Sequence, residues 1–191
     1  MKIKNVCVFL GSSMGSNPIY QEAARSLGNY IAEQSWNLVY GGSSIGLMGI
    51  LAKAALDKGA EVYGVIPQSL YDKVGHHSIT KTFIVENMHE RKMMMQNMSD
   101  CFIAMPGGLG TLEEIFESLT WLQLGFHQKP CAFFNINHYY DALFDFLDHS
   151  VNQGFIKDIH RNSLLEADSP ETLFKKIKVF TPPLDEKWIR E

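Results

Sequence analysis

Short apolar runs alternate along this chain with longer segments in which apolar residues recur every three or four positions. The first pattern predicts buried β-strands, and the second predicts amphipathic helices. The predicted strands are 6–10, 36–40, 62–66, 82–85, 101–105 and 131–134. The predicted helices are 18–34 with Ser16 or Asn17 as its N-cap, 47–58 ended by Gly59, 88–98, 111–124, 139–153 and 170–177. Residues 68–81 are predicted to be a loop that has room for one helical turn.

Strands that alternate with helices at such short intervals predict a mostly parallel sheet with helices on both faces. The expected fold class is therefore α/β, a three-layer sandwich. The chain has 191 residues, enough for one substantial core and too few for two. We expect a single domain over residues 1–191, since no linker, repeat or low-complexity tract interrupts the pattern.

Composition and charge narrow the function. Apolar residues make up 46% and charged residues 20% of the chain, as in an ordinary globular protein. The net charge is −4 without a basic stripe, which argues against nucleic-acid binding. No apolar run approaches the roughly 20 residues of a membrane helix. The start of the chain leads directly into a strand, and Cys7, Cys101 and Cys131 lie in or beside apolar runs, so we expect buried free thiols and a cytoplasmic location.

Three glycine-bearing turns follow predicted strands, at 11–15, 41–46 and 107–111. In a parallel sheet these turns meet at the carboxyl edge, where such folds bind ligands. None matches the dinucleotide fingerprint or the Walker pattern, so nicotinamide enzymes and P-loop nucleotidases are disfavoured. Taken alone, the first turn is equally compatible with simple chain reversal. The convergence of all three turns favours a ligand site.

The most informative segment is 106–114, Pro-Gly-Gly-Leu-Gly-Thr-Leu-Glu-Glu, between a strand and a helix. Glycine lets backbone N–H groups approach a ligand, and a helix start adds unpaired donors with partial positive charge. This combination predicts an anion site, most often for phosphate, with the Glu114 carboxylate beside it. In the alternative interpretation Thr111 and Glu114 form a capping box, which needs no substrate. The residues alone leave these two roles of Glu114 open, and they rank Glu113, on another helix face, lower.

Arg91 and Lys92 lie early in a methionine-rich helix. Two cations near a helix start are unfavourable for its dipole, unless they face an anion or a carboxylate. The alternative is a solvated surface pair. The methionines 93, 94, 95 and 98 are expected to pack in the core. The histidines, including the adjacent pair His76 and His77, show no metal-ligand spacing, so no metal is expected.

Two segments together, Met88-His89-Glu90-Arg91-Lys92 and 106–114, closely resemble the paired signature of the Lonely Guy family. These proteins are cytokinin riboside 5′-monophosphate phosphoribohydrolases, long mislabelled as lysine decarboxylases. The likeness extends over roughly residues 5 to 180. Further segments that look like family segments are Gly11-Ser12-Ser13, Gly41-Gly42, Gly46-Leu47-Met48-Gly49, Val74-Gly75-His76, and Trp121 to Gly125 with Lys129-Pro130.

The resemblance implies a Rossmann-like homodimer without a cofactor. It implies hydrolysis of the N-glycosidic bond of a purine nucleoside 5′-monophosphate, giving free base and ribose 5-phosphate. Arg91 and Glu114 would be the catalytic pair. The implied phosphate and nucleotide contacts come from Gly11, Ser12, Gly42, Met88, Lys92, Gly107, Gly108, Leu109, Gly110, Thr111 and Glu113.

Two rival functions stay open on the sequence. One is an AMP nucleosidase, with plain AMP as the main substrate. The other is a non-catalytic nucleotide carrier or sensor on the same scaffold. The wall around the purine N6 would decide between AMP and its N6-modified form, and Trp121, Phe126, Met88 and Met14 are candidates for it.

Overall fold

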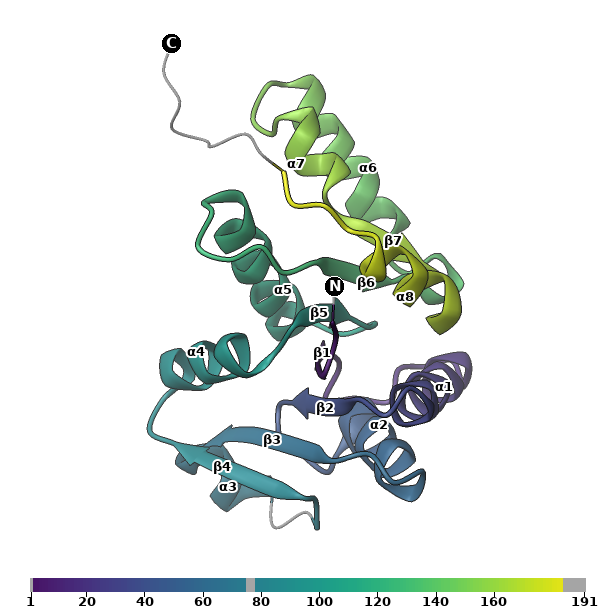
Figure 1. The fold of residues 1–191 in the computed structure, drawn as a ribbon, viewed down its shortest axis with the longest axis vertical. Helices are drawn as coiled ribbons and strands as arrows, with labels where there is room; N and C mark the ends of the chain where they lie inside the picture. Colours follow the sequence, from purple (N-terminus) through teal and green to yellow (C-terminus); the bar gives the residue numbers. More distant parts are fainter. Residues whose placement is uncertain (1, 75–77, 184–191) are drawn as a thin grey trace.

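The computed structural model describes residues 2–74 and 78–183, which form one seven-stranded sheet with helices on both faces (Figure 1). The strands are β1 (Asn5–Phe9), β2 (Asn37–Tyr40), β3 (Val62–Pro67), β4 (Lys81–Val85), β5 (Cys101–Ala104), β6 (Cys131–Phe134) and β7 (Leu165–Ala167). The helices are α1 (Ile19–Glu33), α2 (Gly46–Asp57), α3 (Gln68–Val74), α4 (Met88–Met98), α5 (Leu109–Gln123), α6 (Asp141–Asn152), α7 (Asp158–Asn162) and α8 (Pro170–Lys178), with a 3₁₀ turn η1 (Ile136–His138).

The strand order is β4-β3-β2-β1-β5-β6-β7, and each neighbouring pair is parallel. The chain adds strands on one side of β1 as far as β4 and then returns to the other side of β1 with β5. The topological switch point therefore lies between β1 and β5, the position where open α/β sheets bind ligands. The predicted α/β class is confirmed.

The sheet separates two hydrophobic cores, which confirms the three-layer arrangement. Helices α1, α2 and α8 cover one face, and α4, α5 and α6 cover the other (Figure 1). Along β1, Val6 and Val8 join the first core, whereas Cys7 and Phe9 join the second. Successive side chains of a strand point to opposite faces, so a strand covered on both sides is apolar at every position. This is why the strands appear in the sequence as continuous apolar runs.

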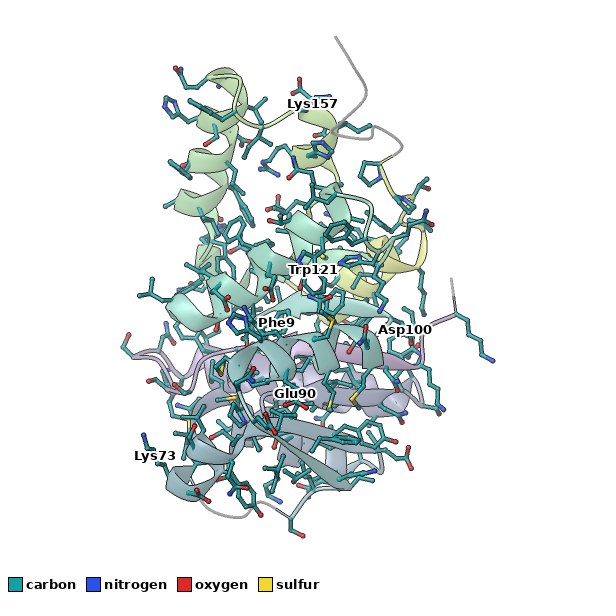
Figure 2. The ribbon with its side chains drawn as sticks, turned by 90° about the vertical axis from the view of Figure 1, so that its left-hand side faces the viewer. Phe9, Lys73, Glu90, Asp100, Trp121 and Lys157 are labelled. Atoms are coloured by element: carbon teal, nitrogen blue, oxygen red, sulfur yellow. The ribbon has the colours of Figure 1, made fainter. Side chains whose placement is uncertain are left out.

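The amino ends and the carboxyl ends of the parallel strands differ in their chemistry. At the amino edge, the Asp100 carboxylate accepts hydrogen bonds from the N–H groups of Lys4 and Asn5, both at 2.8 Å. Figure 2 shows Asp100 and Lys73, which belongs to α3, on opposite sides of the molecule. Helix α3 follows β3 and thus lies toward the carboxyl edge, where the three glycine turns also meet.

Most predicted elements match within one or two residues, but some predictions were wrong. Residues 68–74 form the seven-residue helix α3, where a loop with room for one helical turn had been predicted. Both α7 and β7 were missed. Strand β7 is a short edge strand of half-buried residues, so it lacks the apolar run of the central strands. Helix α1 follows Pro18 without a side-chain cap, although the Asn17 side chain accepts a hydrogen bond from the Ile19 N–H.

The predicted thiols and methionines can be located. Cys7, Cys101 and Cys131 are free and buried, as predicted, and burial raises the pKa of each thiol. Of the α4 methionines, Met95 is fully buried, whereas Met93 is 47% exposed, so the stripe is only partly core. Within the described residues, no helix combines the length and the hydropathy needed to cross a membrane.

Candidate active site

A cavity of about 510 Å³ opens at the carboxyl ends of β1, β2, β3 and β5. Its wall contains most of the site residues predicted from the sequence. These are Gly11, Ser12, Met88, Arg91, Gly108, Leu109, Gly110, Thr111, Glu113 and Glu114. The other three predicted residues, Gly42, Lys92 and Gly107, do not line the cavity. Each is the neighbour in sequence of a residue that does.

The glycine turns reach this cavity because they pack directly on one another. Gly46, at the start of α2, has φ +62°, and a Cβ there would lie 2.2 Å from the backbone of Ser12. The Gly11 N–H donates to the Pro106 carbonyl at 3.1 Å, which joins the first turn to the third. The predicted convergence of the three turns at one edge is therefore observed.

The start of α5 provides free backbone donors. Gly108 is the N-cap, and the first intrahelical bond runs from the Leu112 N–H to the Gly108 carbonyl at 3.2 Å. The N–H groups of Leu109, Gly110 and Thr111 thus precede any acceptor within the helix. The first turn carries no acidic residue to offset its partial positive charge. This geometry suits an anion such as phosphate.

The helix start also tests the capping role considered for Glu114. Helix α5 begins two residues earlier than predicted, so Thr111 lies inside the helix and is not its N-cap. No capping box can form in that register. The Glu114 carboxylate instead accepts a hydrogen bond from Arg91 on α4, with 2.7 Å between Nη1 and Oε1. The capping interpretation is therefore wrong.

Arg91 is fixed from several directions. Its Nε donates to the Val65 carbonyl at 3.0 Å, at the end of β3. Its guanidinium lies against Gly41, where a Cβ would come within 2.3 Å of Nη2. The Arg91 and Glu114 side chains are only 11% and 9% exposed. The sequence hypothesis that Arg91 faces a carboxylate is confirmed, and the alternative of a solvated surface pair is wrong.

The environment of Glu114 acts on its charge in two directions. Burial raises the pKa of the carboxyl above its ordinary value, and the Arg91 cation opposes that rise. Arg91 also keeps the carboxylate oriented toward α4. A buried carboxylate with a shifted pKa in a cleft is a typical feature of a catalytic site.

Lys92, the neighbour of Arg91, makes a second pair of contacts to α5. Its ammonium donates to Glu113 and, at 3.0 Å, to Glu117. Burial lowers the pKa of Lys92, but its hydrogen bonds to the two carboxylates outweigh that effect and the net shift is upward. Glu113 is 53% exposed and contributes to the cavity wall, so Lys92 neutralises a negative charge on that wall.

One side of the cavity is apolar and was largely missed from the sequence. It consists of Ile45, Met48, Ile66, Leu70 and Val74. Leu70 and Val74 belong to α3, which had been predicted as a loop. Ile45 lies in the second glycine turn and Met48 in the predicted helix that follows it, and neither had been named as a site residue.

Of the residues considered for the purine wall, Met88 lines the cavity, whereas Met14, Trp121 and Phe126 do not. Trp121 packs edge-on against Phe126 near the far end of α5, which extends from Leu109 to Gln123. The pair His76 and His77, and the family segment that ends at His76, fall at least partly outside the described residues. Within residues 2–74 and 78–183, no group of three or more His, Cys, Asp or Glu side chains is placed to hold a metal ion.

The fold and the site together define the class. This is a Rossmann-like α/β protein with the start of a helix exposed in a cavity at the switch point of its sheet, and a buried Arg–Glu pair in the same cavity. Sequence comparison identifies the family: residues 48–177 match the family model described as "Possible lysine decarboxylase". The chain belongs to this family, the Lonely Guy family.

Two curated plant relatives illustrate the similarity. Cytokinin riboside 5′-monophosphate phosphoribohydrolase LOG7 of Arabidopsis thaliana is 43% identical over 186 residues, which is 97% of this chain and 86% of that protein. The probable cytokinin riboside 5′-monophosphate phosphoribohydrolase LOGL2 of Oryza sativa is 42% identical over 182 residues, 95% of this chain and 75% of that protein.

Solved structures share the fold. The molybdenum cofactor binding protein of Rippkaea orientalis superposes with a TM-score of 0.70 at 25% identity, covering 93% of this chain and 97% of that chain. The Moco carrier protein of Chlamydomonas reinhardtii has a TM-score of 0.66 at 20% identity, covering 93% and 96%. At that identity the second comparison supports the fold alone.

Proposed function

We propose that this protein hydrolyses the N-glycosidic bond of a purine riboside 5′-monophosphate of the cytokinin type, releasing free base and ribose 5-phosphate. The observation that carries the proposal is the placement of the buried Arg91–Glu114 pair in the same cavity as the free amides of α5. Family membership supports it, since the curated relatives carry this activity in their names.

The 5′-phosphate binds at the start of α5. The N–H groups of Leu109, Gly110 and Thr111 donate to its oxygens, and the helix dipole adds to the attraction. Glu114 lies four residues beyond Gly110, roughly 6 Å along the helix axis. This separation leaves room for the ribose between the phosphate and the carboxylate.

Cleavage of the bond between C1′ and the base nitrogen develops positive charge on the sugar, as in other glycoside hydrolyses. An ionised Glu114 held near C1′ stabilises that charge and orients the attacking water. Arg91 keeps the carboxylate ionised and directed. The electron pair of the broken bond leaves with the purine, which takes up a proton, while water supplies the hydroxyl at C1′.

Phosphate binding also contributes to rate. Contacts far from the reacting atoms supply the energy that orients C1′ against Glu114. A riboside without phosphate should therefore lose turnover as well as affinity. The apolar wall of Ile45, Met48, Ile66, Leu70 and Val74 is suited to the purine and its N6 substituent.

The decarboxylase description of the family model gains no support from the site. Pyridoxal phosphate chemistry needs a lysine amine that can be neutral for Schiff-base formation. Lys92 is paired with two carboxylates and its pKa is raised, which keeps it charged. Its ammonium is therefore suited to charge neutralisation.

One comparison favours a second candidate function, a non-catalytic carrier, because the named function of the Rippkaea orientalis protein is cofactor binding. Both candidates need the anion site, but a carrier has no need for a buried carboxylate beside the sugar. The AMP nucleosidase alternative uses the same chemistry and differs only in the purine.

We further propose that the protein is a cytoplasmic homodimer. The family resemblance supports the dimer, and the free thiols of its three cysteines support the location.

The deciding experiment incubates the protein with AMP and with isopentenyl-AMP in parallel and separates the products by chromatography. We expect free base and ribose 5-phosphate in equal amounts, with the N6-modified nucleotide cleaved faster. Faster cleavage of AMP would make the nucleosidase alternative correct. Tight binding of both nucleotides without base release would establish the carrier.

A further inference from the structure

The carbonyl groups of residues 105–107, just before the N-cap of α5, each accept a hydrogen bond from another segment. The Tyr140 hydroxyl donates to the Met105 carbonyl at 2.6 Å, and the Gly11 N–H donates to that of Pro106 at 3.1 Å. The Tyr139 hydroxyl donates to the Gly107 carbonyl at 2.6 Å. An anion site requires carbonyl oxygens to point away from the ligand, because their partial negative charge repels it. These three contacts satisfy that requirement at three consecutive residues.

The contact to Gly107 has a specific consequence for the next residue. A trans peptide is planar, so its carbonyl oxygen and its N–H point in opposite directions. Fixing the Gly107 oxygen on the Tyr139 side therefore directs the Gly108 N–H to the opposite side. In agreement, Gly108 lines the cavity, whereas Gly107 is not among its lining residues.

An external restraint on this peptide has a physical purpose. It joins two glycines, which have the widest conformational freedom. A Cβ at Gly107 would lie 2.1 Å from Thr111 Oγ1, but nothing lies within 4 Å of a Cβ position at Gly108. Neighbouring side chains thus do not restrain rotation at Gly108. A rotation of the peptide would turn the Gly107 oxygen toward the anion and remove the Gly108 donor in one movement.

Tyr139 is itself held in place by its surroundings. It follows η1, where Asn137 and His138 adopt left-handed φ values of 51° and 60°. His138 contacts the Asp141 carboxylate at 2.9 Å, which stabilises this bend. The Tyr139 ring packs edge-on against Tyr20 of α1 and against Tyr140. The hydroxyl therefore lies at the end of a fixed ring, although the residue is 42% exposed.

We propose that Tyr139 is a positioning residue for the phosphate site, which holds the Gly107–Gly108 peptide with its N–H directed at the 5′-phosphate. The proposal rests on the proposed function for the identity of the anion. Tyr139 does not touch the reacting atoms, so its contribution is confined to phosphorylated ligands. Tyr140 is buried and belongs to the core, so its replacement would test folding and not phosphate recognition.

The test is Tyr139→Phe, which removes the hydroxyl and keeps the ring contacts. Ribose 5-phosphate binding, measured by calorimetry, should weaken roughly threefold to tenfold, as expected for loss of one orienting hydrogen bond. The kcat/KM for the nucleotide should fall by a similar factor, whereas base release from the unphosphorylated riboside should not change. The matched control is Tyr63→Phe. The Tyr63 hydroxyl on β3 is also a hydrogen-bond donor, but its acceptor is the Glu61 carboxylate, and neither residue lines the cavity.

The possible outcomes separate clearly. Equal losses on nucleotide and riboside would mean a general structural role and would overturn the proposal, as would unchanged ribose 5-phosphate binding. If the wild-type protein releases no base but binds ribose 5-phosphate, the proposed function fails while the binding assay still decides the role of Tyr139. If the wild-type protein does not bind ribose 5-phosphate, both proposals are overturned.

Discussion

Two adjacent cations of α4 form ion pairs with carboxylates of α5, and the two sets of ion pairs differ in their exposure to water. Arg91 pairs with Glu114 inside the cavity, and both side chains are about nine-tenths buried. Lys92 is equally buried, but its partners Glu113 and Glu117 are 53% and 26% exposed. The inner pair is thus shielded from water and fixed by a planar guanidinium, whereas the outer cluster shares one point charge between two partly solvated carboxylates.

This difference supports the proposal that the inner pair does the chemistry. Screening by water weakens the outer interactions, so they contribute modestly to stability and charge balance. The inner carboxylate experiences a low-dielectric environment, in which a developing positive charge is stabilised far more strongly. Residues that are neighbours in sequence therefore have separate tasks, because successive positions on a helix face different directions.

The largest expected effect comes from Glu114→Gln. The substitution keeps the shape of the side chain and removes the charge, so we expect turnover to fall at least ~100-fold, as for loss of a preorganised electrostatic group. The measurement is base release under saturating nucleotide. Glu117→Gln on the outer cluster is the matched control and should retain most of the activity. Near-normal turnover in Glu114→Gln would remove this carboxylate from the mechanism.

Arg91→Ala should also abolish most turnover, and in addition it should destabilise the fold. It leaves the Glu114 carboxylate buried without its partner, which costs about 3–5 kcal/mol in comparable buried pairs. Thermal unfolding and base release measured on the same sample check both effects. A double variant, Arg91→Ala with Glu114→Gln, should regain stability but not activity. If stability does not recover, the loss has another origin.

Gly41→Ala tests whether the position of the inner pair matters. The new Cβ would lie 2.3 Å from Arg91 Nη2, so the guanidinium must move. Misplacement of a catalytic group by about 1 Å can lower the rate by ~100-fold. We expect kcat to fall more than KM changes. An unaltered kcat would show that the site tolerates a displaced Arg91.

Lys92→Met should act on binding and not on chemistry. Without Lys92, the Glu113 carboxylate on the cavity wall repels the incoming phosphate. We therefore expect the binding free energy of ribose 5-phosphate to become ~1 kcal/mol less favourable. The turnover number should stay within about threefold of the wild type, since an interaction of this kind leaves the reacting atoms untouched. Adding Glu113→Gln to Lys92→Met should restore the affinity. Failure of that rescue would mean that Lys92 contacts the nucleotide directly.

Several features of the candidate site could be predicted from the sequence, because they depend on residues that are close together along the chain. The glycine-rich segment 106–114 and the sheet alternation placed the anion site at the carboxyl edge, because backbone geometry there depends on nearby residues. The prediction that Arg91 faces an anion or a carboxylate was made because two cations near a helix start interact unfavourably with the helix dipole. These inferences needed no knowledge of distant contacts.

Other features depend on tertiary packing and were missed. The start of α5 at Leu109 follows from Gly108 serving as its N-cap, which the apolar pattern does not show. Helix α3 is short and has no fully buried residue, so its sequence resembles a loop although it supplies Leu70 and Val74 to the cavity. The contact from Tyr139 to Gly107 joins residues 32 positions apart and has no signal in either local segment.

The smallest predicted effect links the two ion-pair regions through pH. In the proposed mechanism Glu114 must be ionised. Burial raises the pKa of this carboxyl above its ordinary value of 4.5, so the acid limb of kcat should lie above pH 4.5. The charge of Glu113 also raises the pKa of Glu114. Glu113→Gln should therefore move the acid limb to lower pH. A pH–rate profile of both proteins provides the measurement, and a shift to higher pH would contradict this coupling.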